Sequence, residues 1–229
     1  FRFKEDLRLP VERVSWFDAH RFAWALGELQ DRKVRLPREA EWEYACRAGT
    51  VTCYHYGEDY PSTAALGNYA WYDQNAYNAN ELYAHQVGHK LPNAFGLYDM
   101  HGNVYEWVED DSHDNYHNAP PDGSAWIDVP RGSARVIRGG CWRHSAGDCR
   151  AAYRGGDRPG GRSRGLVGHR DVSSASTRHQ LVLPPPRPTR CADSGRTCRV
   201  SIVVPFMSLR CSASSRSPRI FTIYSLITP

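Results

Sequence analysis

The chain has 229 residues, of which 24% are charged and 41% hydrophobic, with a formal net charge of +4. This length suits one large domain or one domain with a tail, and the mild charge and the lack of a long apolar run give no support for a nucleic-acid-binding protein or a membrane span. The 7 cysteines form no CxxC pair, which argues against a zinc ribbon, and their odd number leaves at least one thiol unpaired in a monomer.

Two helices are expected near the start of the chain. The first spans residues 16–29, with Ser15 as its N-cap. The second spans residues 38–47, with Pro37 at its start. Apolar periodicity predicts that the first helix buries a face made of Phe17, Phe22, Ala23, Leu26 and Leu29.

The middle of the chain has little periodicity. Residues 49–92 are rich in Tyr, Asn, Gly and His and are expected to be mostly loop. Residues 136–138 predict a strand, and residues 149–154 a second extended piece. The Gly- and Arg-rich residues 154–164 predict a loop.

Composition changes after residue 172. Residues 173–229 are rich in Ser, Arg and Pro, contain one acid (Asp193) and no Lys, and predict a disordered tail. The folded domain is therefore expected to cover residues 1–172. It opens at Phe1 as if inside an ongoing domain, which suggests that it is incomplete at this end.

The stretch FGLYDMHGNVYEW, residues 95–107, is the most informative motif of the chain. Its apolar residues follow neither helical nor strand periodicity. Glycines allow tight or left-handed backbone, and Asp99, Asn103 and Glu106 place side-chain oxygens close together in sequence. Such a segment holds a shape, an ion or both.

Three segments together resemble the formylglycine-generating-enzyme, or sulfatase-modifying-factor, family. They are RLPREAEWEYA at residues 35–45, NAFGLYDMHGNVYEW at residues 93–107, and RGGCW at residues 138–142 followed by Cys149-Arg150. The resemblance covers about residues 10–172. It implies an α+β fold, a variant of the C-type lectin fold, with two helices, small antiparallel sheets and much ordered loop.

The family's enzymes oxidise a sulfatase cysteine to formylglycine and bind copper(I) through two thiolates. In this chain the second of these cysteines falls on Cys149, but the first falls on His144. A mixed Cys149/His144 site is one interpretation; a buried, structural Cys149 is the other. The missing thiol argues against copper and against oxidase activity.

The family's calcium site is better matched. The resemblance places its ligands on Asp99, Gly102, Val104 and Glu106, the middle two through backbone carbonyls. Calcium takes six to eight oxygens, and one curved loop supplies several of them. The alternative is that Asp99 and Glu106 bond backbone amides and brace the loop.

Residues 141–166 carry the strongest functional hint. Many family members have runs of Asn here, and adenine replacement in an Asn codon (AAY) reaches the residues at the matching places: Arg143, His144, Asp148, Gly155, Gly156, Asp157, Arg158, Gly161, Ser163, Arg164 and Gly165. Cys141 can likewise come from a Ser codon (AGY). This pattern is typical of diversity-generating retroelements, which vary a ligand-binding surface in proteins of this fold. Ordinary drift in a tolerant loop is the alternative.

Two functions follow as hypotheses. The first is a non-catalytic ligand-binding domain whose partner is a protein or another surface ligand. Its expected contacts are Trp142, Arg143, His144, Tyr153, Asp157, Arg158, Arg162 and Arg164. The second is a formylglycine-generating-type oxidase that acts on a peptide cysteine through Cys149. The sequence leaves open the oligomeric state and the compartment, prokaryotic cytoplasm or cell surface.

Overall fold

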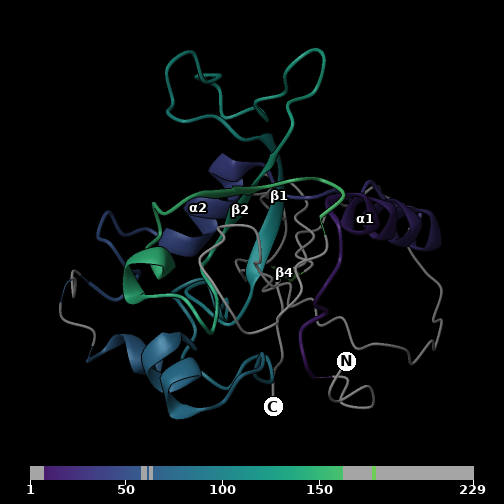
Figure 1. Ribbon diagram of the computed structural model, residues 1–229. Helices are drawn as coiled ribbons and strands as arrows, with labels where there is room; N and C mark the ends of the chain where they lie inside the picture. The colour runs from purple at the N-terminus through teal and green to yellow at the C-terminus, as the bar shows by residue number, and fades with distance from the viewer. Residues whose placement is uncertain (1–7, 58–60, 62–63, 162–176, 179–229) are drawn as a thin grey trace, which may run out of the picture.

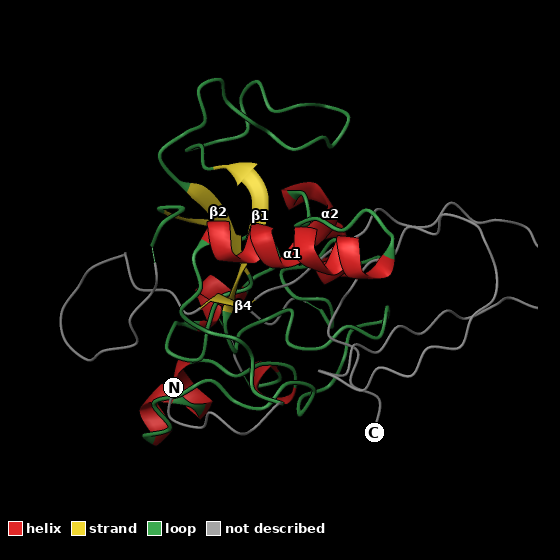
Figure 2. Cartoon of the chain, turned by 90° about the vertical axis from the view of Figure 1, so that its right-hand side faces the viewer, coloured by secondary structure: helices red, strands yellow, loops and turns green. Residues whose placement is uncertain are grey.

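The computed structural model describes residues 8–57, 61, 64–161 and 177–178. Two α-helices, α1 (Trp16–Gln30) and α2 (Glu39–Arg47), lie on opposite sides of a small sheet (Figure 1). Loops make up most of the remaining described chain, as Figure 2 shows. They contain the short 3-10 helices Leu66–Asn68, Asp73–Asn75, Tyr77–Ala79 and Ala146–Cys149.

Helix α1 begins where its sequence predicts and ends one residue later, at Gln30. The Ser15 hydroxyl accepts a hydrogen bond from the Asp18 amide, and the Asp18 carboxylate accepts one from the Ser15 amide. This reciprocal capping box satisfies amides that the first turn leaves without partners. The C-cap residue that follows the helix, Asp31, has a left-handed backbone with φ of 50°.

The predicted buried face of α1 is wrong for three of its five residues. The exposed fractions are 49% for Phe17, 41% for Phe22 and 85% for Leu29. The buried face instead consists of Trp16, Ala19, Ala23 and Gly27. One of its small residues is required by the turn that ends the helix: a Cβ on Gly27 would come within 2.6 Å of the Arg32 carbonyl oxygen. Packing against distant residues, rather than apolar periodicity, selects the face.

Helix α2 is also confirmed. The Glu41 carboxylate accepts the Arg38 amide at 2.9 Å and a two-pronged contact from Arg35, so its first turn is held by a favourable acidic cap. Trp42 and Cys46 on its inner face are fully buried.

The sheet has the order β3-β2-β1-β4. Strand β1 (Tyr105–Asp111) pairs antiparallel with β2 (Arg135–Arg138), and β2 pairs antiparallel with β3 (Gly155–Asp157). Two residues, Thr177–Arg178 (β4), pair parallel with the start of β1. The other residues of the predicted tail lie outside the described residues, so the structure does not test whether they are disordered.

Successive residues of β1 face different helices. Tyr105 and Trp107 pack in one cluster with α1, whereas Val108 packs in another with α2. Alternation along a strand explains this division, because neighbouring side chains point to opposite faces. Residues 105–107, the end of the motif at residues 95–107, thus form part of a central strand between two helices. The expected α+β class is confirmed.

One extended piece is displaced from its prediction. Cys149 ends the 3-10 helix Ala146–Cys149 and residues 150–154 form a turn and a loop, while the strand forms at Gly155–Asp157, where a loop was expected. Glycine has low strand propensity, so no local signal marked this strand. Pairing with β2 overrides that preference, and the Ile137 side chain lies against Gly155. None of the described helices is long and apolar enough to cross a membrane.

Candidate functional site

The two sequence motifs meet in space and are joined by backbone hydrogen bonds. The Gly102 amide donates to the Gly139 carbonyl at 2.6 Å, and the Trp142 amide donates to the Asn103 carbonyl at 2.9 Å. Gly102 and Asn103 both have left-handed backbones, with φ of 102° and 64°. This geometry explains the glycine in the motif, and it sets residues 141–149 directly beside strand β1.

The two carboxylates of the expected calcium set are both buried, Asp99 at 2% and Glu106 at 1% exposure. Glu106 accepts a hydrogen bond from the Trp42 indole at 2.7 Å, and Asp99 accepts one from the Gly88 amide at 2.9 Å. Both therefore brace their surroundings, as the alternative interpretation expects for Asp99.

The carbonyls of Gly102 and Val104 would complete the calcium set. The described residues hold no group of three or more His, Cys, Asp or Glu side chains placed to bind a metal. Calcium differs from transition metals because backbone carbonyls supply much of its shell. The calcium set therefore stays a prediction.

The expected catalytic position contains two thiols and one imidazole. Cys149 and Cys141 are fully buried, and the Cys141 sulfur lies 3.2 Å from His144 Nδ1. Burial raises the pKa of Cys141 to about 11 and that of Cys149 well above its ordinary value. Because a thiolate is the nucleophile and the metal ligand, burial disfavours the reactive form of both sulfurs. The nearness of Cys141 to His144 was not anticipated from the sequence.

Trp142 was expected at the ligand-binding surface, and the structure corrects this. Its side chain is 6% exposed and packs in a core cluster with Ala76, Ala84 and Val104. Tyr153 is partly buried and packs against the α1 cluster. Both side chains support the surface from beneath.

The other expected contacts lie at the surface where they are described. Each described position that an Asn codon can reach by adenine replacement is exposed or half-buried: Arg143, His144, Asp148, Gly155, Gly156, Asp157, Arg158 and Gly161. Intervening Cys149 and Ala151 are fully buried. The separation is partial, because Cys141 is also reachable by adenine replacement but fully buried, and Ser145, Ala152 and Gly160 are exposed without belonging to the set. Arg162 and Arg164 lie outside the described residues.

Arg154 belongs to the framework of this segment. Its guanidinium binds both Glu39 carboxylate oxygens at 2.8 Å and donates to the His113 carbonyl at 2.7 Å. Such a two-pronged pair fixes both position and orientation. Residues 155–161 are therefore attached to α2 and to the loop that follows β1.

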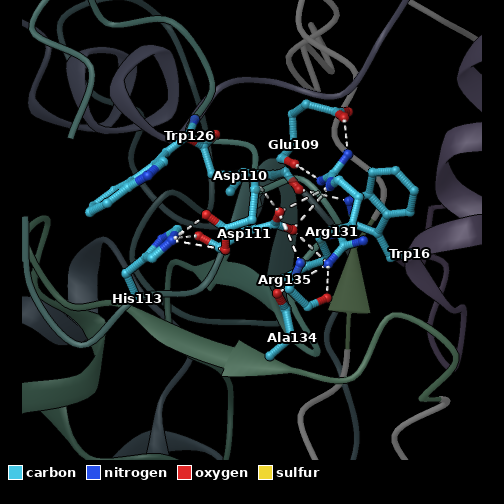
Figure 3. A network of polar contacts seen from close by, with 12 residues as sticks. Trp16, Glu109, Asp110, Asp111, His113, Trp126, Arg131, Ala134 and Arg135 are labelled. Atoms are coloured by element: carbon cyan, nitrogen blue, oxygen red, sulfur yellow. Dashed lines mark hydrogen bonds and ion pairs between the residues drawn. The ribbon is translucent and has the colours of Figure 1, made fainter. Parts of the chain in front are cut away.

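A polar network after β1 was not predicted from the sequence (Figure 3). Asp111 is fully buried, and its carboxylate lies 3.1 Å from Arg131 and 2.6 Å from Arg135. The two arginines also lie over the Trp16 ring. In the sequence, only the run of three acids ending at Asp111 indicated a polar network. The arginines that form ion pairs with Asp111 follow some 20 residues later.

Comparison with known proteins decides the family. The model of the sulfatase-modifying factor enzyme 1-like domain matches residues 2–175. The chain belongs to this family. Among curated relatives of this domain, the Pkn1 serine/threonine-protein kinase of Chlamydia trachomatis is 36% identical over 152 residues, covering 66% of this chain and 22% of the kinase. The formylglycine-generating enzyme of Streptomyces coelicolor is 32% identical over 178 residues, covering 72% and 53%.

Solved structures of the sulfatase-modifying-factor type share the fold. PvdO from Pseudomonas aeruginosa superposes with a TM-score of 0.63 and 31% identity, covering 76% of this chain and 61% of PvdO. Treponema denticola variable protein 1 gives a TM-score of 0.60 and 28% identity, covering 76% and 70%. The chain spans only about a fifth to a half of the length of the curated relatives named above.

Proposed function

We propose that this domain is a non-catalytic ligand-binding module that displays residues 141–166 as a variable surface. One observation carries the proposal: the described positions that an Asn codon can reach all lie at the surface or are half-buried, although Cys141, which adenine replacement reaches from a Ser codon, is fully buried. Similarity to Treponema denticola variable protein 1 supports it. The partner is a protein or another surface ligand.

Sequencing of the gene across a natural population tests this proposal. Diversification predicts substitutions concentrated at AAY-derived codons of residues 143–165, together with a nearby reverse transcriptase gene and a template repeat. Buried Cys149 and Ala151 lie in the same segment and serve as internal controls, which should stay constant. Substitutions spread equally over codons inside and outside residues 143–165 would refute diversification and leave ordinary drift as the explanation.

The alternative is an oxidase of the formylglycine-generating type, which the family relationship favours. Against it stands His144 at the position of the first thiolate, with its Nδ1 directed at Cys141. The test is oxidation of a cysteine peptide in the presence of copper(I). We expect no turnover by this chain and a measurable gain in copper(I) affinity for His144→Cys, which restores a pair of thiols. Robust turnover by the unaltered chain would refute the binding-module proposal.

Calcium is proposed as a structural ion at Asp99, Gly102, Val104 and Glu106. Bound ligand stabilises the folded state by RT ln(1 + [L]/Kd), which is about 2.7 kcal/mol at a hundredfold excess over Kd. Addition of calcium after treatment with a chelator should therefore raise the melting temperature. Glu106→Gln should abolish the rise, whereas the exposed Asp122→Asn should keep it. An unchanged melting temperature would remove calcium from the proposal.

A further inference from the structure

The loop between β1 and β2 extends well beyond the sheet (Figure 1). At its base lies an open depression of about 490 Å³, lined by Ser112, His113, Asp114, Asn115, His117 and Trp126. None of these residues belongs to the variable segment or to the expected metal and thiol positions. The depression is therefore a separate feature of the surface.

The two aromatic side chains of the depression are held in place by the protein (Figure 3). The His113 and Trp126 rings stack with centroids 3.6 Å apart. His113 Nε2 lies 3.1 Å from both Asp128 carboxylate oxygens, and its Nδ1 lies 3.0 Å from the Asp111 carbonyl oxygen. The Trp126 amide donates to Asp110 at 2.8 Å. Side chains fixed before a ligand arrives are a mark of a binding site.

Asp111 fastens both ends of this loop. Besides its contacts with Arg131 and Arg135, its carboxylate accepts the amides of Asp128 at 2.9 Å and Gly132 at 3.2 Å. A long surface loop requires no buried ionic network merely to join two strands. Long loops that are ordered by specific contacts usually carry function.

The chemistry of the lining limits the ligand. It offers a hydroxyl, a carboxylate, an amide, the His117 imidazole and an indole, but no Lys or Arg to bind an anion. The His113 imidazole contributes only its ring, because both of its nitrogens already have protein partners. A lining that holds both donors and acceptors suits hydroxyl groups, each of which both donates and accepts. The amphipathic indole adds an apolar surface. We infer that the depression binds a neutral sugar residue.

This subsite adjoins the proposed variable surface. A Cβ on Gly156 of β3 would come within 2.5 Å of Ser112 Oγ, and Arg154 bonds the His113 carbonyl. One glycosylated ligand could therefore contact both. The sugar subsite depends on the depression alone, so it stands or falls independently of whether residues 141–166 vary.

The experiment is an NMR titration of the ¹⁵N-labelled chain with methyl α-mannoside, methyl β-galactoside and methyl N-acetyl-β-glucosaminide, each to about 50 mM. The Trp126 indole signal is assigned from its loss in Trp126→Phe. We expect that one sugar shifts this signal with a Kd on the order of 1–10 mM, typical of a weak single-residue ligand. Asp114→Asn should weaken binding about tenfold or more, while Asp122→Asn, in the same loop but outside the depression, should not.

Three results would overturn the inference. The first is the absence of a shift with all three sugars in a chain whose spectrum is that of a folded protein. The second is a shift that Asp114→Asn leaves as large as before. The third is a response of the Trp126 signal to Nα-acetyl-lysine methylamide alone, which would assign the depression to a cationic side chain of a protein partner.

Discussion

The buried imidazole of His101 should make this domain sensitive to acid. His101 is fully buried. Its Nδ1 lies 2.7 Å from the Cys149 carbonyl, which can only accept, so Nδ1 carries the proton. Its Nε2 accepts the His55 amide at 3.2 Å and has no room for a second proton. Burial, and then the neighbouring His55, lowers the pKa of His101 from 6.5 to about 3.

The direction of the effect follows from proton linkage. Below pH 6.5 the unfolded chain binds a proton at this imidazole, whereas the folded chain does so only near pH 3. The stabilisation is therefore complete above pH 6.5 and is lost as the pH falls. At about 1.36 kcal/mol per pKa unit, His101 alone should lower the free energy of unfolding by about 2.5 kcal/mol between about pH 7 and pH 4.5.

Urea denaturation at several pH values between about 7 and 4.5 measures this loss. His101→Asn retains an amide donor for the Cys149 carbonyl but cannot titrate. This variant should be less stable at neutral pH. On acidification, its free energy of unfolding should fall by about 2.5 kcal/mol less than that of the original chain. His89→Asn, at an exposed histidine, should leave the pH dependence unchanged. Equal losses for His101→Asn and the original chain would refute the reasoning.

Two further predictions concern the framework of the variable segment. Gly140→Ala should destabilise the fold by about 2 kcal/mol or more in urea denaturation, because φ is +75° and the new Cβ would lie 2.7 Å from Cys149 Sγ. Gly160→Ala, with open space around it, should stay within about 0.5 kcal/mol; similar costs would contradict the packing argument. Arg154→Ala should cost about 2–3 kcal/mol because it leaves the buried Glu39 without its two-pronged partner, whereas exposed Arg158→Ala should be nearly neutral. A neutral Arg154→Ala in the same assay would remove it from the framework.

Local signals predicted the helices but not how they pack. Ser15 and Asp18 specify where α1 starts through contacts three residues apart, so its start can be inferred from sequence. Which face it buries depends on packing against Tyr105 and Trp107, which lie far from it in sequence, and this is a tertiary property. Apolar periodicity therefore selected Phe17 and Leu29, which are exposed.

The candidate site divides in the same way. The family motifs located Cys149 and His144, because their spacing to RGG is local. The contact of Cys141 with His144 depends on the turn between them, and the burial of Trp142 depends on the distant loop that packs over it. The Asp111 network joins residues about 20 apart through side-chain geometry, which no local pattern encodes.

The glycines of β3 limit how far this surface can change. A Cβ at Gly155 would lie 3.0 Å from the Ile137 side chain, and one at Gly156 would lie 2.5 Å from Ser112 Oγ. Random mutagenesis of these two codons would mostly yield residues larger than glycine. A diversified population would therefore lose a share of its members to misfolding at this strand, and the repertoire that reaches a ligand would be smaller than the number of DNA variants produced.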